Sequence, residues 1–243
     1  LKISGEGQKT IYNGNIEPDE VYIDEEKRTL TNNHILNPKN IVKLVWKNPV
    51  TSCESMFRGC SDIIEMNLTH FDTSYAKSMI WMFLGCKKIT SLNITNFDTS
   101  KVTDMYSMFA GCESLSELDI KSFDTSNVED MATMFMDCIN LKEIKISHFK
   151  TDKVIDMFSM FENCSKIQNL DLTNFNTINV ADMSRMFRNC VELTNIYYDI
   201  NKFQTSLVYD MEYMFANNNY LLNLDLSNFR TISCTNKIGR AHV

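Results

Sequence analysis

Hydrophobic and polar residues along the chain follow two different periods within one short stretch. Between Leu118 and Lys121 apolar and polar side chains alternate, which predicts a short strand with one buried face and one exposed face. From Val128 to Cys138 the apolar residues instead recur at steps of three and four, which predicts an amphipathic helix of about three turns. A capping-box pattern that begins at Ser126 supports a helix start at this place.

This strand-and-helix pattern is one unit of a tandem repeat. Cysteine and phenylalanine recur in register with it. A phenylalanine stands near the end of each predicted strand, and a threonine follows two residues later. Neither a strand nor a helix of this length buries its apolar face alone, so neighbouring units must stack to form a core. A Met-Phe dipeptide marks each unit at steps of 26 residues, with a last step of 28, beginning at Met56, Met82, Met108, Met134, Met160, Met186 and Met214.

The repeat predicts an α/β fold, a leucine-rich-repeat-type solenoid of about seven 26-residue strand–turn–helix units. The parallel sheet is expected on the concave side and the helices on the convex side. Residues 1–49 do not fit the repeat, and we interpret them as a β-rich N-terminal cap with an irregular first strand. The solenoid itself spans 50–236. Residues 237–243 depart from the repeat and resemble the translation of a sequencing-library adapter, so we expect a non-native tail and a natural protein that continues.

Two polar columns of the repeat have structural interpretations. A threonine stands before the predicted helix in all seven units, from Thr73 to Thr231, and we expect it to bond backbone amides there or its counterpart in the next coil. Simple turn preference is the alternative. An aspartate column falls in the first turn of the predicted helix, where the helix dipole favours a carboxylate and no clustered oxygen ligands suggest calcium; its members are Asp104, Asp130, Asp156, Asp182 and Asp210.

Composition narrows the classes of function. The formal net charge is −7 and Lys and Arg are not clustered, so we expect no nucleic-acid partner. No apolar run approaches the roughly 18–20 residues that cross a bilayer, so membrane association is expected only through segments missing from this fragment. The eight cysteines occupy positions where the repeat needs a small or medium apolar residue, which favours buried thiols over disulfides or metal ligands. We expect no metal, no cofactor and no enzymatic activity, since the sequence has no nucleophile elbow, phosphate loop or paired-cysteine zinc motif.

Units such as residues 118–138 (LDIKSFDTSNVEDMATMFMDC) resemble the repeats of the BspA-like leucine-rich repeat surface proteins. The same repeat is known from the lipoprotein-associated repeat family of mycoplasmas and from surface proteins of unicellular eukaryotes. The resemblance covers 50–236, about three quarters of the chain. It implies exposure at the cell surface or secretion, with adhesion to host, neighbour or matrix molecules. It implies no shared catalytic residue and no particular ligand.

The polar face of the predicted sheet is the candidate binding surface. Its residues vary between units while the core positions stay constant, which both modular recognition and unselected solvent exposure would produce. Sequons at Asn67, Asn93 and Asn163 are candidate N-glycosylation sites. The candidate ligand-binding residues of the concave face are Glu117, Asp119, Glu143, Lys145, Asn169, Asp171, Asn195, Tyr197 and Asp225.

Taken together, these features predict a cell-surface or secreted recognition and adhesion module that binds a protein or glycan through the concave face. An intracellular protein-interaction scaffold is the alternative, because core cysteines without evident disulfides also suit a reducing compartment. A signal segment and an anchor in the complete gene would favour the first interpretation.

Overall fold

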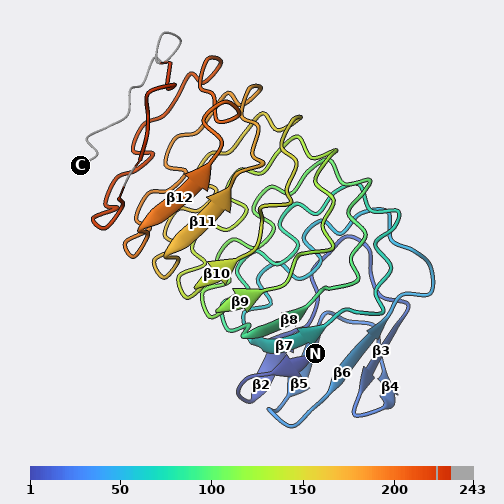
Figure 1. Ribbon diagram of the computed structural model, residues 1–243. Coiled ribbons are helices and arrows are strands. Elements are labelled where there is room, and N and C mark those ends of the chain that lie inside the picture. Colours follow the sequence, from blue (N-terminus) through green and yellow to red (C-terminus); the bar gives the residue numbers. More distant parts are fainter. Residues whose placement is uncertain (223, 231–243) are drawn as a thin grey trace.

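The computed structural model describes residues 1–222 and 224–230, which form a stack of coils with a layer of antiparallel strands at its N-terminal end (Figure 1). The described residues contain no helix, and therefore none long and apolar enough to cross a membrane. The strands of the coils lie side by side along one side of the stack: β7 (Ile63–Asn67), β8 (Ser91–Asn93), β9 (Glu117–Leu118), β10 (Glu143–Ile144), β11 (Asn169–Leu172) and β12 (Asn195–Tyr198).

Two small antiparallel sheets make up the N-terminal cap. In the first, β3 (Glu20–Ile23) pairs with β4 (Glu26–Arg28) and with β6 (Val42–Val45). In the second, β2 (Gly7–Thr10) pairs with β5 (Asn33–Leu36). The sequence predicted an irregular first strand at the end of residues 1–49. The strand at that place, β6, pairs inside the cap, and β1 (Lys2–Ile3) is the strand that lies antiparallel beside β7.

The coils stack in parallel, and β7 pairs with β8, β9 with β10 and β11 with β12, each residue opposite the one 26 positions on. Glu117 pairs with Glu143, and Asn169 pairs with Asn195. Leu118 is buried and Asp119 is exposed, so the predicted alternation of the strand is confirmed. One face of this parallel pairing therefore packs on the core and the other is open to solvent.

The predicted helices are wrong. Residues 132–137 of this segment are a run of consecutive turns, in which Thr133 and Asp137 have left-handed φ values of 55° and 60°. Alternate amides from Met131 to Asp137 donate to the next coil, as Met131 N does to Asp156 O at 3.1 Å, and not to the fourth residue back. Closely wound turns also bring every third or fourth side chain to one side, which is why the apolar period suggested a helix. The solenoid consists of short strands and turns, so the α/β fold class with a convex helical layer is incorrect.

Columns of stacked phenylalanine rings fill the core. In the column that contains Phe135, successive ring centroids lie 5.5 to 5.9 Å apart and successive planes are within 12° of parallel. Trp46 of the cap contacts the first ring of this column, Phe57, edge-on at 6.5 Å. Since each coil contributes one ring, every interior coil is held by the rings of both neighbours.

The threonine column is confirmed as a ladder between coils. Thr151 Oγ1 donates to the Asn176 carbonyl at 2.9 Å and accepts from the Asn176 amide at 2.7 Å, and the Thr151 side chain is fully buried. Thr231 lies outside the described residues. The same two bonds to the residue 25 positions on are made by Thr73, Thr99, Thr125 and Thr205.

The cysteines form another buried column. The seven described cysteines are free thiols with no exposed surface, which confirms the buried-thiol interpretation for them; Cys234 lies outside the described residues. From Cys86 onward each thiol donates to a carbonyl of the preceding coil, as Cys138 Sγ does to Phe109 O at 3.3 Å. Burial raises the pKa of Cys138 to about 12. These thiols serve as small apolar core residues.

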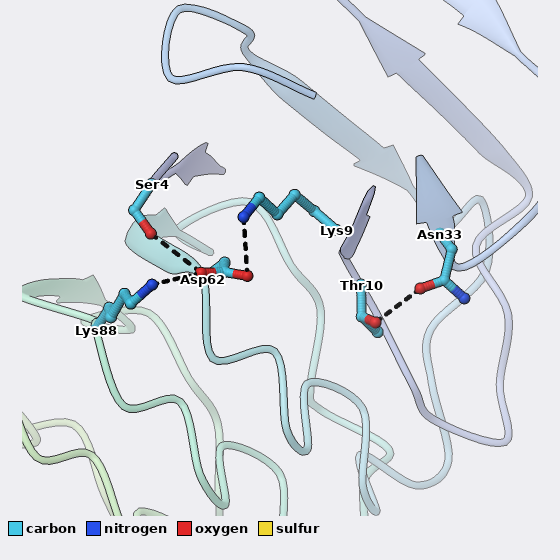
Figure 2. A network of polar contacts seen from close by, with 6 residues as sticks. All are labelled: Ser4, Lys9, Thr10, Asn33, Asp62 and Lys88. Atoms are coloured by element: carbon cyan, nitrogen blue, oxygen red, sulfur yellow. Dashed lines mark hydrogen bonds and ion pairs between the residues drawn. The ribbon is translucent and has the colours of Figure 1, made fainter. Parts of the chain in front are cut away.

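Asp62 connects the cap to the coils (Figure 2). Its carboxylate accepts hydrogen bonds from Ser4 at 3.3 Å and Lys9 at 3.1 Å in the cap, and from Lys88 at 2.6 Å in the next coil. The bond from Lys88 is the main reason that the pKa of Asp62 lies below its ordinary value. One partly buried carboxylate thus joins three segments of the chain.

Candidate functional site

We call the exposed surface formed by β7 to β12 and the turns that follow them the sheet face. Its parallel register places predicted residues beside one another, because Glu117 pairs with Glu143 and Asp171 pairs with Tyr197. Tyr197, the aromatic residue among them, is 52% exposed. The structure exposes all of the predicted ligand-binding residues except Asn195, which is partly buried: Glu117, Asp119, Glu143, Lys145, Asn169, Asp171, Tyr197 and Asp225.

A shallow depression of about 450 Å³ lies on the sheet face across three coils. It brings together four of the predicted residues, and it leaves out those of β11, β12 and the last coil. The depression is also lined by Thr90, Thr95 and Lys121, which were not predicted as binding residues. Lys121 could have been predicted, because the alternation of exposed residues that includes Asp119 continues to it. The lining residues are Thr90, Ser91, Leu92, Asn93, Thr95, Glu117, Leu118, Asp119, Lys121, Glu143 and Lys145.

The charged side chains of this depression contribute little to the fold. Lys145 and Glu143 lie 3.6 Å apart with 67% and 72% of their side chains exposed, and Lys121 and Asp119 form a similar exposed pair at 3.6 Å. Exposed ion pairs of this kind are worth roughly 0–1 kcal/mol. In the threonine and cysteine columns, in contrast, the polar side-chain atoms form hydrogen bonds between coils. The sheet face therefore holds charged groups that can turn to a ligand at small cost in stability.

A sequence profile described as "Mycoplasma protein of unknown function, DUF285" matches residues 31–117, 51–169, 112–198 and 166–238. The chain belongs to this family. The four overlapping matches run through every coil, and together they cover 31–238. None of the curated proteins matches the chain.

One solved structure, a leucine-rich repeat protein from Bacteroides ovatus, is 14% identical over 92% of this chain and 88% of its own. The TM-score between the two structures is 0.22.

The three sequons of this DUF285 chain lie in different surroundings. Asn67 and Asn93 are exposed on the sheet face, where each Oδ1 accepts bonds from the threonine two residues on. Asn163 belongs to a ladder of side-chain amides: its Nδ2 donates to Asp137 at 2.6 Å and its Oδ1 accepts from Asn189 at 2.7 Å. A glycan on Asn163 would have to break this ladder, whereas glycans on Asn67 and Asn93 would project from the early part of the sheet face.

The aspartate column does not cap helices, because the described residues have none. Each of the five carboxylates accepts the amide two residues on, as Asp130 does from Ala132 at 2.8 Å, and consecutive members form parallel bridges between coils. Burial, followed by the charges of Asp104 and Asp156, raises the pKa of half-buried Asp130 to about 6. Among the described residues no group of three or more His, Cys, Asp or Glu could hold a metal ion.

Asp130→Asn is expected to stabilise the protein at pH 8 by about 1 kcal/mol, a value reduced to allow for solvent screening of this half-exposed group. The folded state raises the pKa of Asp130 to about 6, so it favours the neutral carboxyl. The stability that the neutral carboxyl contributes to the fold is fully present below the ordinary pKa of aspartate and is lost as the pH rises through 6. Asparagine remains neutral and can still accept from Ala132. Thermal melts of both proteins at pH 8 and pH 4 measure the difference, which should vanish at the lower pH.

Asp124→Asn provides the matched control with the opposite sign. Asp124 also accepts the amide two residues on, but hydrogen bonds from Ser126 hold its pKa below the ordinary value. Its ionised form therefore stabilises the fold, and the variant should be the less stable protein at pH 8. Equal pH dependence of the two variants would contradict the assignment of a raised pKa to Asp130.

Proposed function

We propose that this protein is a recognition module that binds a protein or glycan partner through the sheet face, displayed at the cell surface or secreted. The observation that carries the proposal is the depression of about 450 Å³ lined by charged side chains of three successive coils. These side chains make only exposed ion pairs with one another. The net charge of −7 gives no reason to expect nucleic acid as the partner.

Binding on such a surface has a low entropic cost. The strands beneath the depression are held by backbone pairing to their neighbours and by buried side chains such as Leu118 and Ile144. A ligand therefore needs to order only the surface side chains, and rigid scaffolds lose less free energy on binding than flexible loops do. Variation of the exposed residues over a constant core then changes the ligand without changing the fold.

A charge-swap variant tests the binding surface. Glu143→Lys combined with Lys145→Glu keeps the net charge and the local ion pair but reverses the charge pattern of the depression. Arrays of glycans and matrix proteins would identify a ligand of the parent protein. We expect the swap to weaken the binding of that ligand about tenfold or more. The matched control swaps Lys87 and Glu113, an exposed ion pair that does not line the depression. Ligands that bind both swapped proteins as tightly as the parent would overturn the proposal.

Location is tested separately, since the intracellular scaffold has an observation in its favour. The seven described cysteines are free, which is typical of a reducing compartment, although their burial also protects them elsewhere. Protease added to intact cells that express the protein should digest it and spare a cytosolic marker. Digestion only after permeabilisation would favour the scaffold function instead.

A further inference from the structure

A second hollow, of about 340 Å³, opens at the turns that follow β10, β11 and β12. We propose that this basic hollow binds the acid group, carboxylate or sulfate, of an acidic saccharide. It lies on the sheet face but shares none of the described lining residues with the depression, so the proposal rests on the function proposed above and adds a second site to it. The charge swap at Glu143 and Lys145 tests the depression and Lys150→Asp tests the hollow, so a failure of one is distinguished from a failure of the other. The lining residues are His148, Lys150, Asp152, Asn174, Asn176 and Lys202.

The charge at position 150 is reversed relative to the preceding coils. The residue before the ladder threonine is Asp72, Asp98 or Asp124 in those coils, and each carboxylate accepts the backbone amide two residues on at 2.9 to 3.0 Å. Lys150 cannot accept such a bond, although its own amide still donates to Thr125 at 2.8 Å. The fourth coil thus keeps the ladder but replaces a turn-stabilising carboxylate with a cation.

Two ammonium groups of the hollow are free for an anion. Within the part of the chain that the structure describes, neither Lys150 nor Lys202 forms an ion pair, on a protein whose acidic residues outnumber its basic ones. Lys202 Nζ donates to Asn174 Oδ1 at 3.2 Å, a bond that holds the ammonium at the hollow and leaves two of its hydrogens. Lys150 helps to lower the pKa of Asp124, after the bonds from Ser126, but does not pair with it. An acid group placed between the two ammonium groups would gain charge-assisted hydrogen bonds from both.

Acceptors around these cations suit sugar hydroxyls. His148 Nε2 lies 3.2 Å from the Ile120 carbonyl, and the tautomer that donates there has Nδ1 as an acceptor. Asn176 donates to one oxygen of Asp152 at 2.7 Å, which orients the carboxylate and leaves its other oxygen as an acceptor. None of the described residues that line the hollow is apolar. Cations for the acid group together with acceptors for hydroxyls match an acidic sugar better than a bare inorganic anion.

Calorimetric titration with galactose 6-sulfate, glucuronic acid and neutral galactose tests the proposal. We expect the two acidic sugars to bind and galactose to bind at least about tenfold more weakly, the ratio that one lost charge-assisted contact produces. Lys150→Asp should weaken the binding of the acidic sugars at least about tenfold. This variant restores the residue that three earlier coils carry, so its melting temperature should not fall. Lys142→Asp, which changes an exposed lysine outside the hollow by the same charge, should alter affinity less than about twofold.

Three outcomes would overturn the assignment. The first is unchanged binding of the acidic sugars by the Lys150→Asp protein, or no binding by the parent. The second is inorganic sulfate that binds as tightly as galactose 6-sulfate, which would leave no role for the acceptors. The third is a poly-glutamate peptide that binds when neither acidic sugar does, which would make the hollow a site for acidic peptides.

Discussion

Phe135→Ala is expected to lower the free energy of unfolding by about 3–5 kcal/mol, the largest effect of any single change predicted for this protein. The Phe135 ring is fully buried and stacks on Phe109 at 5.7 Å and on Phe161 at 5.5 Å. Its removal leaves a cavity between two coils and deprives both neighbouring rings of a partner. Denaturant unfolding followed by circular dichroism measures the loss.

The same variant should also divide the array. In a solenoid each coil is stabilised by its neighbours, so a weak interface in the middle lets the two halves unfold separately. Trp46 and Trp81 both lie on the N-terminal side of Phe135, so tryptophan fluorescence reports on that half alone. We expect fluorescence and circular dichroism to give the same midpoint for the parent and different midpoints for the variant. Tyr197→Ala, which removes a 52% exposed ring, is the control and should cost about 0.5 kcal/mol or less. A loss below 1 kcal/mol for Phe135→Ala would show that the stacked column is not the core.

The sequence was sufficient to predict stacking, strands and core, because these depend on spacing alone. Any chain that repeats its apolar residues every 26 positions must place equivalent side chains in columns, whatever conformation joins them. Leu118 and Ile120 were therefore predicted to be buried, and both are. The same reasoning placed Glu117 and Asp119 on the exposed face, where the structure has them.

The helix was predicted incorrectly because a period of three to four residues does not distinguish a helix from a series of tight turns. A different signal in the sequence argues against the helix. The residue before each cysteine from Cys60 to Cys190, and before Asn218 at the equivalent position of the next coil, adopts a left-handed φ between 59° and 73°. Glycine, asparagine and aspartate tolerate this conformation best. A helix interior disfavours glycine at a fixed position in several units. These residues are Gly59, Gly85, Gly111, Asp137, Asn163, Asn189 and Asn217.

The candidate site was predicted less completely than the fold. The face that carries it follows from the alternation of the strands, but the depression depends on how long each side chain is and which neighbours it pairs with across coils. Lys121 and Lys145, for example, contribute to one depression from different coils, which the sequence of a single unit cannot show. The basic hollow was missed for a related reason, since Lys150 and Lys202 are far apart in sequence and meet only through the stacking of coils.

Thr151→Val is expected to destabilise the protein by about 2–3 kcal/mol although it preserves the shape of the side chain. Valine can neither donate to the Asn176 carbonyl nor accept from the Asn176 amide, so two backbone groups at a buried site lose their partner. The cost of leaving buried polar groups unpaired exceeds the net gain from forming such bonds, and the extra apolar burial of valine offsets only part of it. Chemical denaturation measures the change in free energy, and hydrogen exchange of the Asn176 amide should become faster in the variant.

Two further substitutions separate the hydroxyl from the rest of the side chain. Thr151→Ser keeps both hydrogen bonds and loses only a buried methyl group, so it should cost about 1 kcal/mol, less than Thr151→Val. Thr173→Val removes an exposed hydroxyl whose one hydrogen bond within the described part of the chain is to Asp171, and it should change stability by about 0.5 kcal/mol or less. If serine at position 151 were as destabilising as valine, the column would act through packing, and the ladder of hydroxyls would not be what holds one coil to the next.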